Sequence, residues 1–133
     1  MPHDEIKVFV YGSLKRGYWN SYILENSEFI GEAEIKGYDL FDVGSFPAIV
    51  EQIPFEDRFE LKRVQGEIYL VDPDTVERLD RLEGVLPGNN GMYLRKMATA
   101  IDEDRKSHLV YVYVWNQSTD RLTLIEGESW PAK

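Results

Sequence analysis

The sequence contains no cysteine and only two histidines, His3 and His108. Without cysteine, the chain has no disulfide, no thiolate nucleophile and no sulfur ligand for a metal ion. The histidines form no His-x-x-x-His or Glu-x-x-His pattern, so we expect neither a metal site nor a cofactor. No serine lies in a Gly-x-Ser-x-Gly motif, which argues against a serine hydrolase.

Long apolar runs and a surplus of basic residues are also missing. No run approaches the roughly 18 apolar residues of a membrane span, and the N-terminus lacks the basic and apolar segments of a secretory signal. The 15 Lys and Arg residues stand against 24 Asp and Glu, a formal net charge of −9 that opposes nucleic acid and acidic membranes. We therefore expect a cytoplasmic protein whose partner is a small molecule; the sequence leaves the oligomeric state open.

The chain of 133 residues shows no repeat, low-complexity tract or linker, so we expect a single domain over residues 1–133. Runs rich in β-branched and aromatic residues predict strands at residues 8–10, 29–35, 38–42, 48–51, 65–71, 93–101 and 109–115. The polar segment 102–107 predicts a hairpin turn between the last two strands. Residues 18–26 form either a short helix or an irregular crossing, and residues 122–133 either cap the fold or join a neighbour.

One clear helix is predicted between the strands. Asp72 is suited to cap its free amide groups, Pro73 suits its first position, and Gly84 marks its end. Many short strands, glycine-rich corners and one helix predict an α+β fold, a curled mixed sheet or small mixed β-barrel. We expect the helix to pack against the mouth of the barrel, with short helical turns beside it.

Glu83 is the unusual residue of this helix. At about 100° per residue, Val76, Leu79 and Leu82 lie at roughly 0°, −60° and −120°, and Glu83 lies at roughly −20°, inside their apolar arc. A carboxylate that points inward loses hydration and meets the negative end of the helix dipole, and both effects raise its pKa. Such a group suits a general acid/base. The alternative is that the last turn frays and leaves Glu83 in water.

A second motif is the segment Val-Phe-Val-Tyr-Gly-Ser-Leu-Lys-Arg-Gly at residues 8–17. It reads as a strand followed by a turn between two glycines. Gly12 lets the backbone approach a ligand, and successive amide N–H groups in such a turn form an anion site. A phosphate-binding loop needs Lys and then Ser or Thr after its second glycine, but Tyr18 and Trp19 follow here, so we reject nucleotide binding.

One shielded acid/base and a set of backbone donors suit an intramolecular acyl transfer. When a nucleophile and a carbonyl group of one substrate close a five-membered ring, the effective molarity reaches about 10⁵–10⁸ M. Positioned proton transfer adds about 10²–10⁴-fold, and one oxyanion donor adds about 10²–10³-fold. Paired carboxylates for glycoside hydrolysis stay possible by number, although no second acid shares the inward placement of Glu83.

Several segments together resemble one known family: residues 8–17, Gly-Glu-Ile-Tyr at 66–69, Leu-Asp-Arg-Leu-Glu-Gly at 79–84 and Tyr-Leu-Arg at 93–95. The chain resembles gamma-glutamylcyclotransferase-like proteins and, among them, the gamma-glutamylamine cyclotransferase branch. The segments at 46–50 and 110–113 also fit, so the resemblance covers nearly the whole chain. Ser13 differs from the threonine of some amine-releasing members.

The resemblance implies a small mixed barrel, with the turn after the first strand at the rim of a cavity and Glu83 inside it. Glu83 would take a proton from the substrate's alpha-amine and return it to the departing amine, which leaves 5-oxoproline. The gamma-glutamyl group would be held largely through backbone groups of Tyr11, Gly12, Ser13 and Leu14.

Three further residues have two readings each. Tyr93 and Tyr113 would line the cavity, or they are strand aromatics that pack in the core. Arg95 pairs with a carboxylate, either in the site or only structurally. The segment 84–91, with three glycines and Pro87, either closes over the site or stays open.

Other functions are compatible with the same sequence. One alternative is a non-catalytic binding module for a small carboxylate or gamma-glutamyl ligand. Another is removal of a gamma-glutamyl protecting group from a natural product, which uses the same chemistry on a bulkier acceptor. The sequence leaves the leaving amine and the pathway undetermined.

Overall fold

The computed structural model describes residues 6–12, 14–15, 17–18, 21–44, 46–52, 61–85 and 91–130. In chain order, these residues form β1 (Ile6–Val10), η1 (Ser21–Leu24), β2 (Glu28–Lys36), β3 (Tyr38–Asp42), β4 (Pro47–Glu51), β5 (Arg63–Val71), α1 (Pro73–Glu83), β6 (Tyr93–Asp102), β7 (Ser107–Trp115) and β8 (Thr123–Ile125). Each predicted strand is present, and η1 is a short 3₁₀ helix within the 18–26 segment. Only β8 was not predicted, because three residues carry too short a pattern.

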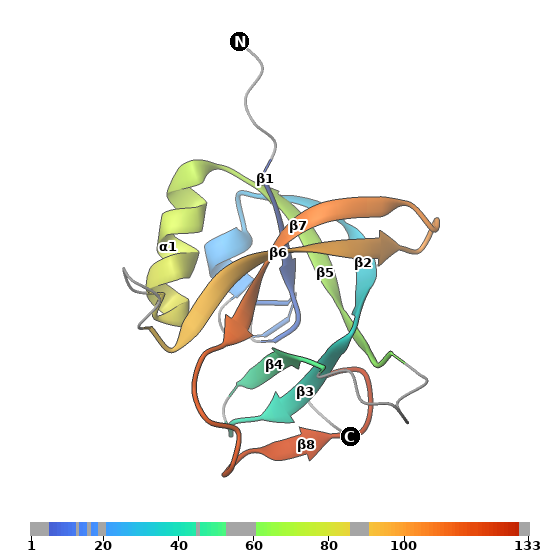
Figure 1. Cartoon of the computed structure of the whole chain (residues 1–133). Coiled ribbons are helices and arrows are strands. Elements are labelled where there is room, and N and C mark those ends of the chain that lie inside the picture. The colour runs from blue at the N-terminus through green and yellow to red at the C-terminus, as the bar shows by residue number, and fades with distance from the viewer. Residues whose placement is uncertain are drawn as a thin grey trace.

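Five strands close into a barrel in the order β1-β5-β2-β6-β7, which confirms the predicted small mixed β-barrel (Figure 1). Neighbouring strands are antiparallel except β1 and β7, which meet in parallel at Val8 and Tyr111. The predicted hairpin joins β6 to β7. Strands β4, β3 and β8 form a separate antiparallel sheet, seen below the barrel in Figure 1.

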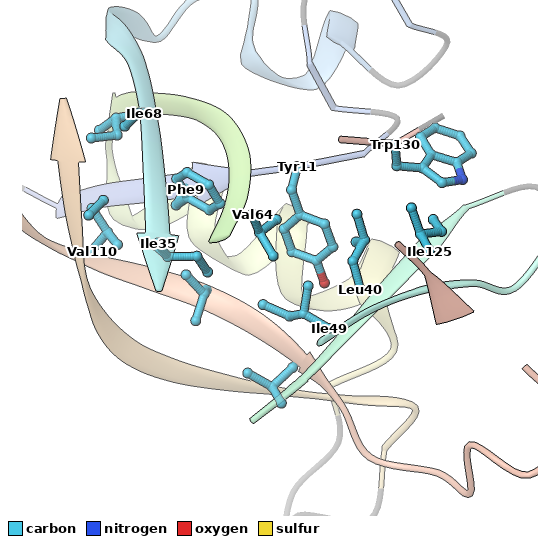
Figure 2. Packing of buried hydrophobic residues seen from close by; sticks show 14 residues of the cluster. Phe9, Tyr11, Ile35, Leu40, Ile49, Val64, Ile68, Val110, Ile125 and Trp130 are labelled. Atoms are coloured by element: carbon cyan, nitrogen blue, oxygen red, sulfur yellow. The ribbon is translucent and has the colours of Figure 1, made fainter. Parts of the chain in front are cut away.

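The interior of the barrel is one apolar core. Figure 2 shows Phe9 of β1 beside Ile35 and Ile68, with Tyr11 farther along toward the small sheet. The same cluster reaches Ile125 and Trp130, which are both buried. The C-terminal stretch therefore packs onto this chain's own core, which is the capping alternative.

The last three residues of β1 are buried although their side chains alternate between the two faces of the strand. Phe9 belongs to the barrel core, whereas Val8 and Val10 pack in a second cluster with Val76 and Leu79 of α1. The helix thus covers the outside of the barrel on the side of β1, and Figure 1 shows η1 between α1 and β1. The expectation that it packs against the barrel mouth was wrong, since the outward side chains of β1 are themselves apolar and need a cover.

The helix begins and ends where the sequence predicts. The Asp72 carboxylate accepts a hydrogen bond from the Thr75 N–H at 2.7 Å, and Pro73 is the first helical residue. Gly84 adopts a left-handed φ of 68°, and the next amide donates to the Asp80 carbonyl at 2.9 Å. No helix among the described residues is long and apolar enough to cross a bilayer.

The helical wheel is right for Val76 and Leu79, which are buried, but wrong for Leu82, which is 41% exposed. Leu82 lies at the edge of the apolar arc and in the last turn. The Leu82 side chain lines a pocket, described below, instead of packing in the core.

Candidate functional site

A pocket of about 280 Å³ opens where the end of α1 meets the turn after β1. Its walls come from β1 and the turn that follows, the start of β4, the end of α1, the start of β6, and β7. The lining residues are Phe9, Val10, Tyr11, Gly12, Leu14, Phe46, Pro47, Leu82, Glu83, Met92, Tyr93 and Tyr113. Most of these side chains are apolar or aromatic.

Glu83, the last residue of α1, lines this pocket. The last turn does not fray, so the alternative of a solvated side chain is wrong. The residue keeps partial exposure because the pocket is open, yet protein atoms crowd its carboxyl group. Burial raises the pKa of Glu83 from 4.5 to about 7. At neutral pH this carboxyl group is therefore present in both its protonated and ionised forms.

The turn after β1 forms the wall opposite the helix end. A Cβ on Gly12 would lie 2.6 Å from Cδ and Cγ of Pro47, so only glycine lets this backbone pass. The Lys15 N–H donates to the Gly12 carbonyl at 3.0 Å and closes the turn. No partner among the described residues occupies the amide N–H of Gly12 or Leu14. Ser13, also predicted for this site, lies outside the described residues.

Three tyrosines line the pocket, and each donates its hydroxyl proton to a protein acceptor. Tyr11 donates to the Tyr113 carbonyl at 2.6 Å, Tyr93 to the Pro47 carbonyl at 2.7 Å, and Tyr113 to the Asp80 carboxylate at 2.8 Å. Burial raises the pKa of all three hydroxyls above its ordinary value, so they stay neutral at physiological pH.

Tyr93 and Tyr113 therefore satisfy both readings made from the sequence. Each is 2% exposed and packs in the second apolar cluster, the one that contains Val8 and Val10, and each also lines the pocket. Their rings form rigid walls because their hydroxyl groups are held by hydrogen bonds.

Asp80 contacts a residue of the pocket wall, Tyr113, and the sequence reasoning gave it no role. Its second carboxylate oxygen accepts from Arg95 at 2.5 Å, and the Arg95 guanidinium lies 4.7 Å from the centre of the Tyr111 ring. The predicted pairing of Arg95 with a carboxylate is thus confirmed. Asp80 links α1 to β6 and β7 one turn before Glu83. The i, i+3 spacing of Asp80 and Glu83 on one helix is the sequence signal that could have identified it.

Phe46, Pro47 and Met92 are further lining residues that were not predicted as site residues. They come from the start of β4 and the residue before it, and from the residue before β6, which are far apart in sequence, so no local pattern joins them. Residues 86–90, most of the segment considered as a lid, lie outside the described residues. No three His, Asp or Glu side chains of the described part of the chain gather closely enough to hold a metal ion.

Comparison with known proteins gives consistent results. Residues 8–132 match the model of the family described as "Gamma-glutamyl cyclotransferase, AIG2-like". A relative from Methanocaldococcus jannaschii is 35% identical over 112 residues, which cover 84% of this chain and 85% of the relative. The Escherichia coli K12 protein described as gamma-glutamylcyclotransferase family protein YtfP is 31% identical over 125 residues, which cover 94% of this chain and 96% of that protein.

A solved structure supports the same relationship. The crystal structure of an AIG2-like protein from Mus musculus superposes with a TM-score of 0.71 at 26% sequence identity. The match covers 94% of this chain and 88% of the mouse chain. The likeness therefore extends over nearly the whole chain.

Proposed function

The chain belongs to the gamma-glutamyl cyclotransferase, AIG2-like family, and from this premise we propose that it is a cyclotransferase acting as one domain over residues 1–133. It converts a gamma-glutamyl amine or gamma-glutamyl amino acid to 5-oxoproline and the free amine. The single observation that carries this proposal is the Glu83 carboxyl group in the pocket wall, with its pKa raised by burial to about 7. A carboxyl group poised in this way both accepts and returns a proton near neutral pH.

The reaction needs one proton carrier and no external nucleophile. The neutral alpha-amine of the substrate attacks its own gamma-carbonyl carbon and closes a five-membered ring. Glu83 takes a proton from the attacking nitrogen and delivers it to the departing nitrogen. The amide C–N bond then breaks, and 5-oxoproline and the amine leave with no net change in protons. Because both reacting groups belong to one substrate, an effective molarity of about 10⁵–10⁸ M is available to a correctly folded substrate.

The turn after β1 supplies the binding contacts in this proposal. The amide N–H groups of Gly12 and Leu14, which no described residue occupies, are suited to hydrogen-bond the substrate carboxylate or the oxyanion that forms on the gamma-carbonyl. Tyr11 and Ser13 complete the turn, mainly through their backbone groups. Tyr93 and Tyr113 wall the pocket, and the missing Cβ of Gly12 leaves room for the backbone beside Pro47.

The direct test combines a set of gamma-glutamyl compounds with the Glu83→Gln variant. Wild-type protein should release 5-oxoproline, detected by mass spectrometry, and the variant should lose at least about 10²-fold in kcat because the proton carrier is gone. Glu77→Gln, an exposed position on the same helix, is the matched control and should keep wild-type rates. Circular dichroism establishes that both variants fold. Wild-type turnover by Glu83→Gln would refute the mechanism.

Two other functions give different results in the same assay. A non-catalytic binding module would bind gamma-glutamyl compounds tightly and form no 5-oxoproline. Glu83 argues against it, because no cation lines the described part of the pocket to pair with a buried carboxylate. An enzyme that removes a gamma-glutamyl protecting group from a natural product would form 5-oxoproline, but only from a bulkier acceptor.

A further inference from the structure

The mouth of the pocket is apolar. Leu82 and Met92 both line the pocket, yet they are 41% and 45% exposed. A single exposed apolar side chain on a surface is ordinary. Leu82 and Met92 are two large ones in the lining of the same pocket, and we call this pair the apolar rim. This rim offers a surface that a bound ligand would shield from water.

The rim is held by backbone hydrogen bonds. The Met92 N–H donates to the Gly84 carbonyl at 2.9 Å, and the Met92 carbonyl accepts from the Asn116 N–H at 2.9 Å. A Cβ on Gly84 would lie only 3.4 Å from the Met92 Cβ, so the end of α1 and the approach to β6 are in close contact. Leu82, two residues before Gly84, is therefore positioned relative to Met92 by main-chain structure.

No Lys, Arg or His belongs to the described residues that line the pocket. Among the described residues that line the pocket, Glu83 is the one Asp, Glu, Lys, Arg or His. Nearby cations have other contacts, since Arg95 binds Asp80 and the Lys15 ammonium donates to the Trp130 carbonyl. A carboxylate on the leaving amine would lose water against Leu82 and Met92 and would find no counter-ion among the described residues that line the pocket.

We propose that the leaving group is an uncharged apolar amine, whose hydrocarbon chain covers Leu82 and Met92 outside the gamma-glutamyl site. The inference rests on the proposed function and names its substrate class. Leu82 and Met92 are then specificity-determining residues, and they do not take part in the chemistry. Substrates with a carboxylate or an ammonium group at the same distance from the amide are disfavoured.

The test uses three synthetic probes of similar length: gamma-glutamyl-n-butylamine, gamma-glutamyl-beta-alanine and gamma-glutamyl-1,3-diaminopropane. Wild-type kcat/KM is measured for each, and binding of each to the inactive Glu83→Gln variant is measured by calorimetry. The butyl probe should be favoured by at least about tenfold over both charged probes. Across methyl, ethyl, propyl and butyl amides, each added methylene should improve kcat/KM by roughly three- to fourfold while it contacts the rim. Equal or better use of a charged probe overturns the proposal.

Lysine substitutions at the rim provide the second test. Leu82→Lys and Met92→Lys should lower the preference for the butyl probe over the beta-alanine probe by about tenfold or more, because each adds a cation and removes apolar surface. Leu124→Lys and Met97→Lys are matched controls, since these residues are of the same types, are 46% and 49% exposed, and lie outside the pocket lining. An equal shift in the controls would mean that net charge sets the preference, and this would overturn the inference.

Failure of this inference and failure of the proposed function look different. If 5-oxoproline forms without a preference for the butyl probe, the proposal of an apolar leaving group is refuted and the proposed cyclotransferase activity still stands. Preferential binding of the butyl probe without 5-oxoproline supports the apolar mouth and refutes the cyclotransferase. If none of the three probes binds, both are refuted.

Discussion

Glu83→Gln should change the dependence of stability on pH, whatever the substrate is. Burial raises the pKa of Glu83 from 4.5 to about 7, so the folded protein binds this proton more tightly than the unfolded chain. Unfolding then releases a proton at any pH between these values, and stability falls as pH rises. The loss of stability begins near the pKa of Glu83 in the unfolded chain and is complete above its pKa in the folded protein. Glutamine has the same shape without the proton, so it removes this contribution.

The size of the effect follows from the two pKa values. A pKa that rises from 4.5 to about 7 on folding lowers the free energy of unfolding relative to a side chain that does not ionise. The reduction is roughly 1 kcal/mol at pH 5 and roughly 3 kcal/mol at pH 8, at about 1.36 kcal/mol per pKa unit. The stability of Glu83→Gln relative to the wild type should therefore rise by about 2.5 kcal/mol between these pH values. With a urea m-value of about 1–3 kcal/mol/M, the difference between the two midpoints should grow by roughly 1–2.5 M.

Urea unfolding at pH 5, 6, 7 and 8, followed by tryptophan fluorescence and circular dichroism, measures this difference. Other titrating groups are shared by both proteins, so they cancel when the two stabilities are subtracted. Glu77→Gln removes an exposed carboxylate from the same helix and controls for the change in net charge. A stability difference between Glu83→Gln and wild type that stays constant from pH 5 to pH 8 would refute the argument that Glu83 is buried.

Four further predictions test the site and the fold. The kcat/KM of the wild type should rise by at least about tenfold from pH 6 to pH 8, because ionisation of Glu83 near pH 7 supplies the base and the substrate's alpha-amine also loses its proton over this range; a flat profile would contradict this. Gly66→Ala should destabilise by about 1–3 kcal/mol, measured by thermal unfolding, since its Cβ would collide with β1, whereas Gly127→Ala meets open space. Asp72→Ala should cost about 1 kcal/mol in the same measurement through loss of the helix cap. Asp80→Asn should cost about 1 kcal/mol by breaking its ion pair, and it should slow turnover if Asp80 holds the helix in place; unchanged stability would contradict that role.

Local patterns predicted the local structure well. The cap at Asp72, the left-handed end at Gly84 and the strand alternation each depend on neighbours in sequence, and the structure contains all three. The inward turn of Glu83 also followed from helical periodicity alone. The same reasoning failed for Leu82, because a helical wheel gives a direction and does not say whether core or pocket lies there.

The composition and local spacing of this chain determined its class: a small acidic α+β protein without cysteine, with an inward carboxyl group at the end of its helix and a glycine turn after its first strand. Only the tertiary structure decided that β1 carries the helix on its outer face, that Asp80 joins Tyr113 to Arg95, and that Leu82 and Met92 share a pocket mouth. These contacts join residues far apart in sequence. They arise when the strands close into a barrel, and no periodicity along the chain encodes which distant side chains that closure brings together.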